Sequence, residues 1–268
     1  MQITSPEELL NLNNNKFIGE IPKLTNSQIN INGKNNILFC EENVNLWNSR
    51  IDFNGDNSIL YLSSNNFDYA LNISINGNNV CFIGKNNFFN GVLTIVLSES
   101  QNVIIGADCL FSYGISIRVA DGHLIYHTKT KERLNFSKSI YIGDHNWLGQ
   151  STMILKGTHI GSGSIIGANS VLSNKIVPSN TTFAGSPARL TKKNTFWLGY
   201  SVHPWDEITT LKYSKYESEN FVYEVDDNTL DLEDIELDLN TISNVDEILF
   251  YIQSTFLEAG KNRFALNP

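Results

Sequence analysis

The chain contains 268 residues, carries a formal net charge of −9 and is 41% hydrophobic. This hydrophobic content can form a substantial core, which excludes a disordered or fibrous protein. The negative charge argues against nucleic acid as the main partner, because binding to phosphates requires a positively charged surface.

The N-terminal segment, residues 1–16, is predicted to be a cap that precedes the regular part of the chain. Glu7 and Glu8 stand where a secretory signal would carry basic and then apolar residues. No apolar run approaches the length needed to cross a membrane. The three cysteines, an odd number, are expected to be free thiols in a reducing compartment. We therefore expect a cytoplasmic protein without membrane insertion.

Residues 17–126 consist of five tandem copies of a 22-residue segment. Each copy begins with an aromatic or aliphatic residue and has an isoleucine near its middle, and three copies contain an Asn-Gly turn pair. The copies begin at Phe17, Phe39, Tyr61, Ile83 and Ile105, and the shared isoleucines are Ile29, Ile51, Ile73, Ile95 and Ile117. Such a period is typical of a solenoid, in which each coil buries its apolar face only against its neighbours.

Residues 142–177 continue this pattern as six hexads, which begin at Ile142, Leu148, Ile154, Ile160, Ile166 and Leu172. In a narrow triangular prism, one aliphatic side chain per edge points inward at every level, and only a small side chain fits near each corner. The two kinds of repeat together predict an all-β triangular solenoid of seven coils over residues 17–190.

An insertion, residues 121–139, interrupts the solenoid at the corner that carries Asn-Gly in earlier copies. It contains Asp121, His123, Tyr126 and Arg133. A long excursion from a rigid scaffold is a usual place for functional residues. We therefore predict that this loop contributes to an active site.

The remaining residues, 191–268, are predicted to form a C-terminal extension. Residues 206–246 are acidic and aromatic, and we expect a strand or an extended arm there. One helix is predicted over about 244–259, with Ser243 and Asp246 as a capping pair. Its apolar stripe, which we expect to dock on the rest of the protein, consists of Ile248, Ile252 and Phe256.

Motifs between residues 117 and 193 resemble those of the hexapeptide-repeat acetyltransferases, most closely the bacterial capsule or sialic-acid O-acetyltransferases. The motifs are Asp121-Gly122-His123, Ile142-Gly143-Asp144-His145-Asn146-Trp147-Leu148-Gly149, Ile154-Leu155-Lys156-Gly157, Ile166-Gly167-Ala168-Asn169-Ser170-Val171 and Ala184-Gly185-Ser186-Pro187-Ala188-Arg189. The resemblance implies a left-handed parallel β-helix with an inserted catalytic loop and a C-terminal extension containing one helix. It also implies a homotrimer that binds acetyl-CoA between neighbouring prisms.

Acetyl transfer to a hydroxyl requires a base for the proton and a donor for the oxyanion. His123 matches the family's catalytic histidine, which would take the proton from the acceptor and return it to the CoA thiolate. Asp121 lies two residues away and is a candidate to orient the imidazole ring. Trp147 matches the Trp-Leu-Gly motif and is expected to face outward beside the acceptor or the thioester. The alternative role for Trp147 is a wedge in the trimer interface.

The resemblance also implies binding residues. Arg189 and Lys192 match basic residues near the CoA phosphates, where a guanidinium can make bidentate contacts. The pantetheine groove would be lined, mostly by backbone groups, by Gly149, Gln150, Ala168 and Ser173. The candidates for contact with the acceptor, where basic side chains would suit an anionic sugar, are Tyr126, Arg133 and Lys156.

The predicted function is therefore acetyl-CoA-dependent O-acetylation of a bacterial surface glycan, with sialic acid as the favoured acceptor. An N-acetyltransferase acting on a nucleotide-linked amino sugar is one alternative, although such proteins usually carry a nucleotide-binding domain ahead of the prism. A non-catalytic glycan-binding solenoid is another. A zinc hydrolase would need two histidines five residues apart on one coil, but Gln150 stands five residues after His145. We therefore expect no metal.

Overall fold

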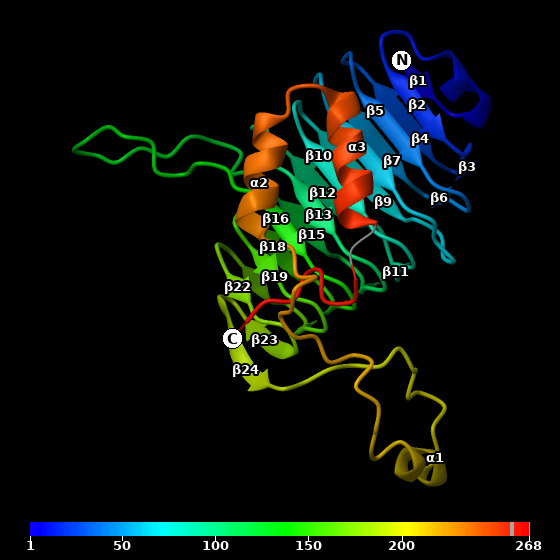
Figure 1. The fold of residues 1–268 in the computed structure, drawn as a ribbon, viewed down its shortest axis with the longest axis vertical. Helices are drawn as coiled ribbons and strands as arrows, with labels where there is room; N and C mark the ends of the chain where they lie inside the picture. Colours follow the sequence, from blue (N-terminus) through cyan, green and yellow to red (C-terminus); the bar gives the residue numbers. More distant parts are fainter. Residues whose placement is uncertain (258–259, 268) are drawn as a thin grey trace.

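The computed structural model describes residues 1–257 and 260–267. Its main body is a three-sided prism (Figure 1). The first face contains β1 (Gln2–Ile3), β4 (Gln28–Ile31), β7 (Arg50–Phe53), β9 (Leu71–Ile75), β12 (Leu93–Leu97), β15 (Ser116–Arg118), β18 (Met153–Leu155) and β21 (Val171–Leu172). The second face contains β2 (Lys16–Gly19), β5 (Ile37–Cys40), β8 (Ile59–Leu62), β10 (Val80–Ile83), β13 (Val103–Ile105), β16 (Ile140–Ile142), β19 (His159–Ile160) and β22 (Ile176–Val177).

The third face is built from two groups of strands. The N-terminal coils contribute β3 (Lys23–Thr25) and β6 (Asn45–Trp47), which pair with each other. The later coils contribute β11 (Phe88–Phe89), β14 (Leu110–Phe111), β17 (Trp147–Leu148), β20 (Ile165–Ile166), β23 (Thr181–Gly185) and β24 (Ala188–Lys193). The strand β24 turns back and pairs antiparallel with β23 at the end of the prism.

Equivalent positions of the repeat stack directly on one another, because successive coils pair in parallel register. One column on the first face consists of fully buried Ile29, Ile51, Ile73, Ile95, Ile117, Ile154 and Leu172. The column passes without a break from the 22-residue repeats into the hexads. It therefore confirms the predicted parallel β-helix, and its length matches the expected seven coils.

The Asn-Gly corners are packed too tightly for side chains. A Cβ atom added to Gly33 would lie 1.9 Å from the carbonyl oxygen of Gly55, and one added to Gly55 would lie 2.2 Å from that of Asn76. Nearby, Asn35 and Asn57 both have positive φ angles, and their side chains are joined by a hydrogen bond of 2.7 Å. Glycine is required here by the close approach of consecutive coils.

Additional elements cover the N-terminal end and one face of the prism. The strand β1 pairs antiparallel with β4, and the short 3-10 helix η1 (Pro6–Asn11) buries Leu9. The C-terminal helices α2 (Leu232–Thr241) and α3 (Val245–Phe256) pack on the second face (Figure 1). A shorter helix, α1 (Glu207–Lys212), lies far from the prism.

The C-terminal extension differs in part from its prediction. The apolar stripe of α3 is buried as expected, but the N-cap is Asn244, whose side chain accepts from the amide of Asp246 at 2.8 Å. Glu258 and Ala259, at the end of the predicted helix, lie outside the described residues. The expectation of one helix was wrong, because residues 206–246 contain α1 and α2 and no strand.

The sequence analysis missed α2 because its apolar residues alternate with acidic ones and do not form a clear helical stripe. Only Ile235 and Leu239 are buried, and half of the other residues are acidic. Its N-cap is Asp231, whose carboxylate accepts from the amides of Glu233 and Asp234. Packing on the second face therefore stabilises a helix whose own pattern is weak. In the described part of the chain, every helix is too short or too polar to cross a membrane.

Candidate active site

The insertion forms a hairpin that projects from the prism. It leaves the first face after β15 and returns to the second face as β16. The amide of Leu134 donates to the carbonyl of Ile125 at 2.8 Å, and Tyr126 pairs antiparallel with Arg133. His123 is exposed and precedes Ile125 and Tyr126 in the first arm of this hairpin.

Asp121 is held by two side chains at the base of the hairpin. Lys156 Nζ lies 2.5 Å from its carboxylate, and Asn135 Nδ2 donates to the same oxygen at 2.9 Å. The hydrogen bonds from Lys156 and then Asn135 lower the pKa of this carboxyl below its ordinary value. Among the described residues, no hydrogen bond joins Asp121 to the His123 ring. In this structure Asp121 therefore fixes the loop base.

A second anion fixes the returning arm of the hairpin. Arg133 Nη2 lies 2.8 Å from the carboxylate of Glu99, and Ser137 Oγ donates to the same oxygen. The hydrogen bonds from Arg133 and then Ser137 lower the pKa of Glu99 to about 2. Arg133 is thus paired with a carboxylate of the preceding coil.

Trp147 lies outward on the third face. Its side chain is 41% exposed, and its neighbours in register are Leu110 of β14 and Ile165 of β20. Its ring centroid lies 6.2 Å from that of Trp197. The outward position predicted for Trp147 is thus observed, next to an aromatic residue that the sequence analysis did not select.

Trp197 is fixed by an aromatic stack. The His145 ring lies between the rings of Trp197 and Phe221, at centroid distances of 4.4 and 4.2 Å. Trp197 Nε1 donates to the carbonyl of His145 at 2.8 Å, and His145 Nε2 lies 3.0 Å from the carbonyl of Trp197. Burial lowers the pKa of His145. The neutral imidazole with the proton on Nε2 fits these contacts, so His145 anchors the C-terminal extension.

Gly149, Gln150 and Ala168 lie where the third face turns into the first. The amide of Gly149 donates to the carbonyl of Ile166 at 2.8 Å, and that of Asn169 donates to the carbonyl of Gln150 at 2.8 Å. A Cβ atom on Gly149 would lie 2.6 Å from the amide nitrogen of Ala168. Main-chain stacking therefore sets the geometry of this corner.

Arg189 and Lys192 lie on the antiparallel strand β24, which ends the third face. Arg189 is opposite Ala184, and Lys192 is opposite Thr182. Both basic side chains are exposed. Ser173, in contrast, follows β21 of the first face and lies at the corner that carries Lys156, whose carbonyl accepts from the amide of Asn174 at 2.9 Å.

The predicted site residues therefore divide between two edges of the first face. We call one edge the loop corner, which contains Asp121, His123, Tyr126, Arg133, Lys156 and Ser173. We call the other the groove corner, which with the adjoining third face contains Trp147, Gly149, Gln150, Ala168, Arg189 and Lys192. A face about five residues wide spans roughly 16 Å at about 3.3 Å per residue. One chain therefore does not bring both groups to the same atoms.

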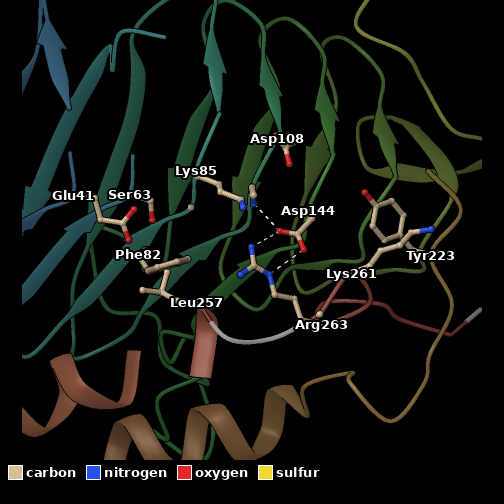
Figure 2. Close-up of a pocket in the computed structure, with 13 residues that line it drawn as sticks. Glu41, Ser63, Phe82, Lys85, Asp108, Asp144, Tyr223, Leu257, Lys261 and Arg263 are labelled. Atoms are coloured by element: carbon tan, nitrogen blue, oxygen red, sulfur yellow. Dashed lines mark hydrogen bonds and ion pairs between the residues drawn. The ribbon is translucent and has the colours of Figure 1, made fainter. Parts of the chain in front are cut away.

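A cavity of about 440 Å³ lies elsewhere, between the second face and residues Leu257, Lys261 and Arg263 (Figure 2). Arg263 donates to both carboxylate oxygens of Asp144, at 3.0 and 2.7 Å, and both side chains are buried. The residues that line the cavity in the described part of the chain include none of the predicted site residues. This ion pair docks the C-terminal extension on the prism. The described residues contain no cluster of three or more potential His, Cys, Asp or Glu metal ligands.

Comparisons with known proteins relate the chain to bacterial transferases. Residues 139–174 match the family described as "Bacterial transferase hexapeptide (six repeats)". The chain is 47% identical over 90 residues to a polysialic acid O-acetyltransferase of Escherichia coli O1:K1 / APEC, covering 34% of this chain and 29% of that protein. It is 44% identical over 110 residues to a polysialic acid O-acetyltransferase of Neisseria meningitidis, covering 40% of this chain and 51% of that protein.

The match therefore spans less than two thirds of the length of either curated relative. A longer match is found in the crystal structure of the polySia-specific acetyltransferase NeuO, with a TM-score of 0.63 and 30% sequence identity. It covers 75% of this chain and 94% of that structure. The likeness thus includes the larger part of the prism.

Proposed function

This chain belongs to the hexapeptide-repeat acetyltransferases, and we propose that it transfers an acetyl group from acetyl-CoA to a hydroxyl of a sialic-acid-containing bacterial surface glycan. The observation that carries this proposal is the likeness to NeuO over 94% of that structure, at 30% identity. The names of the two curated relatives support the choice of a polymeric sialic acid as acceptor.

His123 is proposed as the general base. Its neutral imidazole accepts the proton of the acceptor hydroxyl while the hydroxyl oxygen attacks the thioester carbonyl carbon. The tetrahedral intermediate then breaks its C–S bond, and the imidazolium returns the proton to the CoA thiolate. The exposed position of His123 on a projecting hairpin supports this role, because a large acceptor can reach it.

Trp147 is proposed to form a wall of the same site. Its exposed indole offers an apolar face to a sugar ring or thioester and an N–H group to a developing oxyanion. Trp197 supports this surface from one side through the contact between the two rings.

Acetyl-CoA is proposed to bind at the groove corner. A pantetheine chain would run along the backbone of Gly149, Gln150 and Ala168, where close stacking of the coils sets the geometry. Arg189 and Lys192 carry exposed positive charges on β24, which suits contact with the CoA phosphates. The predicted absence of a catalytic metal remains part of this proposal.

A second copy of the chain is proposed to complete each site, in a homotrimer. The loop corner of one prism would face the groove corner of its neighbour. His123 and Ser173 of one copy would then lie close to Trp147 and the CoA groove of the next copy. The positions of these residues on two edges of the first face support this arrangement. The second face is covered by α2 and α3, which leaves the first and third faces for contact between copies.

We propose structural roles for the two basic residues of the loop corner. Lys156 and Arg133 are each paired with a carboxylate of their own chain, so we propose that they hold the hairpin and do not bind the acceptor. Tyr126 is 52% exposed and remains a proposed contact for the glycan. We further propose that the reaction takes place in the cytoplasm, where acetyl-CoA is available and where the buried thiols of Cys40, Cys81 and Cys109 stay reduced.

The decisive test is product analysis. The purified protein is incubated with acetyl-CoA and with polysialic acid, sialic acid monomer, a neutral glycan or a nucleotide-linked amino sugar, and products are examined by mass spectrometry. We expect an added acetyl ester, labile to mild base, on sialylated acceptors only. A base-stable acetamide on the nucleotide sugar, or no acetylated product with any acceptor, would contradict the proposal.

The shared site is tested by mixing two impaired variants. His123→Ala and Trp147→Ala protomers, coexpressed with different tags, should regain about a quarter of wild-type activity, because random assembly combines the two intact groups in one site of four. Each variant alone should keep only its own residual activity, which is lower than that of the mixture. An active protein that light scattering shows to be a monomer would contradict the trimer.

A further inference from the structure

Asn135, on the returning arm of the hairpin, has a buried polar side chain. It is 6% exposed, whereas His123 and the rest of the first arm are exposed. Asn135 Nδ2 donates to the carbonyl oxygen of His123 at 2.7 Å and to the carboxylate of Asp121 at 2.9 Å. Its Oδ1 accepts from the amide of Ile125 at 2.9 Å. A single side chain thus makes hydrogen bonds to Asp121, His123 and Ile125.

The orientation of this amide is determined by its partners. The carbonyl of His123 and the carboxylate of Asp121 are acceptors only, so both N–H groups must face them. The amide of Ile125 is a donor, so Oδ1 must face it. The opposite flip would replace three hydrogen bonds with three repulsive contacts.

Other interactions extend this contact to the rigid prism. Asp121 is paired with Lys156, which follows β18, while Arg133 Nη2 donates to the carbonyl of Asn135 at 3.2 Å and is paired with Glu99. Little apolar packing supports the first arm, where Leu124 and Ile125 are 57% and 52% exposed. The hydrogen bond from Asn135 therefore constrains the backbone at His123 directly.

We propose that Asn135 is the positioning residue of the base: it acts through the backbone of His123 and contacts neither substrate. This inference rests on the role of His123 proposed above. Small displacements of a catalytic group lower rates strongly, and an error of 1 Å can cost about 100-fold. Asn135→Ala should therefore lower kcat by roughly 10- to 100-fold and leave the KM for acetyl-CoA unchanged.

The test combines Asn135→Ala with His123→Ala. If Asn135 acts only through His123, the double variant should be no slower than His123→Ala, because residues that act as a unit are not additive. The isosteric Asn135→Asp keeps the volume but replaces both donors with acceptors, and it should lose as much activity as Asn135→Ala while folding normally. Glu132→Ala, an exposed site on the same hairpin, serves as the control with wild-type activity.

Three results would overturn the inference. The first is unchanged kcat in Asn135→Ala. The second is a double variant that is slower than His123→Ala by the same factor by which Asn135→Ala is slower than wild type. The third is full activity in Asn135→Asp, since it would show that volume and not the donors matters. Failure of the proposed function gives a distinguishable result, because the wild-type protein itself would then transfer no acetyl group.

Discussion

The loop corner and the groove corner are edges of the same face, but different forces fix their geometry. At the groove corner, main-chain hydrogen bonds between stacked coils position Gly149, Gln150 and Ala168. At the loop corner, side-chain contacts of Asp121 and Asn135 position the backbone that carries His123. The first corner should tolerate polar substitutions and fail when backbone space is lost, whereas the second should respond to single polar substitutions.

The sharpest test of this comparison is the removal of the proposed base. His123→Ala should lower kcat by roughly 100- to 10,000-fold, the usual contribution of general-base catalysis, with acetyl-CoA affinity near normal. Steady-state kinetics together with calorimetric binding of CoA would measure both. His127→Ala, an exposed histidine of the same hairpin, is the matched control and should remain active.

The complementary test at the groove corner is the substitution of Arg189. Arg189→Ala should raise the KM for acetyl-CoA by about 10-fold and change kcat less, because it removes binding energy that substrate and transition state share. If His123→Ala and Arg189→Ala altered the same kinetic constant, the division of roles between the corners would be wrong.

Trp147→Ala tests whether the third face forms an active-site wall. Turnover should fall by roughly 10- to 1000-fold while the trimer persists, the upper value matching the loss of an oxyanion donor. Trp47→Ala provides a control, because Trp47 lies on the same face, is 45% exposed and belongs to an N-terminal coil. Sedimentation of both variants separates an active-site wall from an interface wedge, which would weaken the trimer.

Gly149→Ala tests the main-chain nature of the groove corner. The added Cβ would lie 2.6 Å from the nitrogen of Ala168 and 2.7 Å from the oxygen of Ile166, so the coils must separate. We expect a destabilisation of roughly 1–3 kcal/mol, typical of overpacking, and a raised KM for acetyl-CoA. Denaturant unfolding measures the loss of stability, and steady-state kinetics measure the KM. Gly122→Ala on the loop has no atom within 4 Å of the new Cβ and should be neutral in stability.

The smallest effect is expected from Glu99, which holds the returning arm. Its pKa is about 2 in the folded protein and 4.5 as an ordinary side chain, so its pairing stabilises fully above about pH 4.5 and is lost as the pH falls toward 2. The pair is partly exposed, so Glu99→Gln should cost less than about 1 kcal/mol at neutral pH.

This prediction is checked by thermal melts of wild type and Glu99→Gln between pH 7 and pH 3. The difference in midpoint should stay constant down to about pH 4.5 and shrink as the pH falls further. A difference that stayed constant over this range would mean that the charge of Glu99 does not stabilise the hairpin.

Much of the fold was predictable because its contacts repeat. The column that begins at Ile29 and ends at Leu172 joins each coil to the next, so one period in the sequence predicted the whole stack. The place of the insertion followed from the same period. The stripe of Ile248, Ile252 and Phe256 predicted a docked helix because three adjacent turns share one face.

The candidate site was predictable only as a set of residues. The family resemblance selected His123, Trp147 and Ser173. The sequence did not place Trp147 on the third face and the other two at the opposite edge of the first face. It also missed Asn135 and Trp197. Asn135 stands in no motif, and its importance comes from three contacts within a folded hairpin.

The sequence by itself determined the prism, because each coil contacts only neighbours at a constant spacing and the pattern of side chains records that spacing. The tertiary structure alone decided how the C-terminal extension and the hairpin are held. Arg263 binds Asp144 across 119 positions, and Glu236 of α2 accepts from Ser139 at the loop exit across 97 positions. Each of these contacts occurs only once and does not follow the sequence repeat. The partners can therefore be identified only in the folded chain.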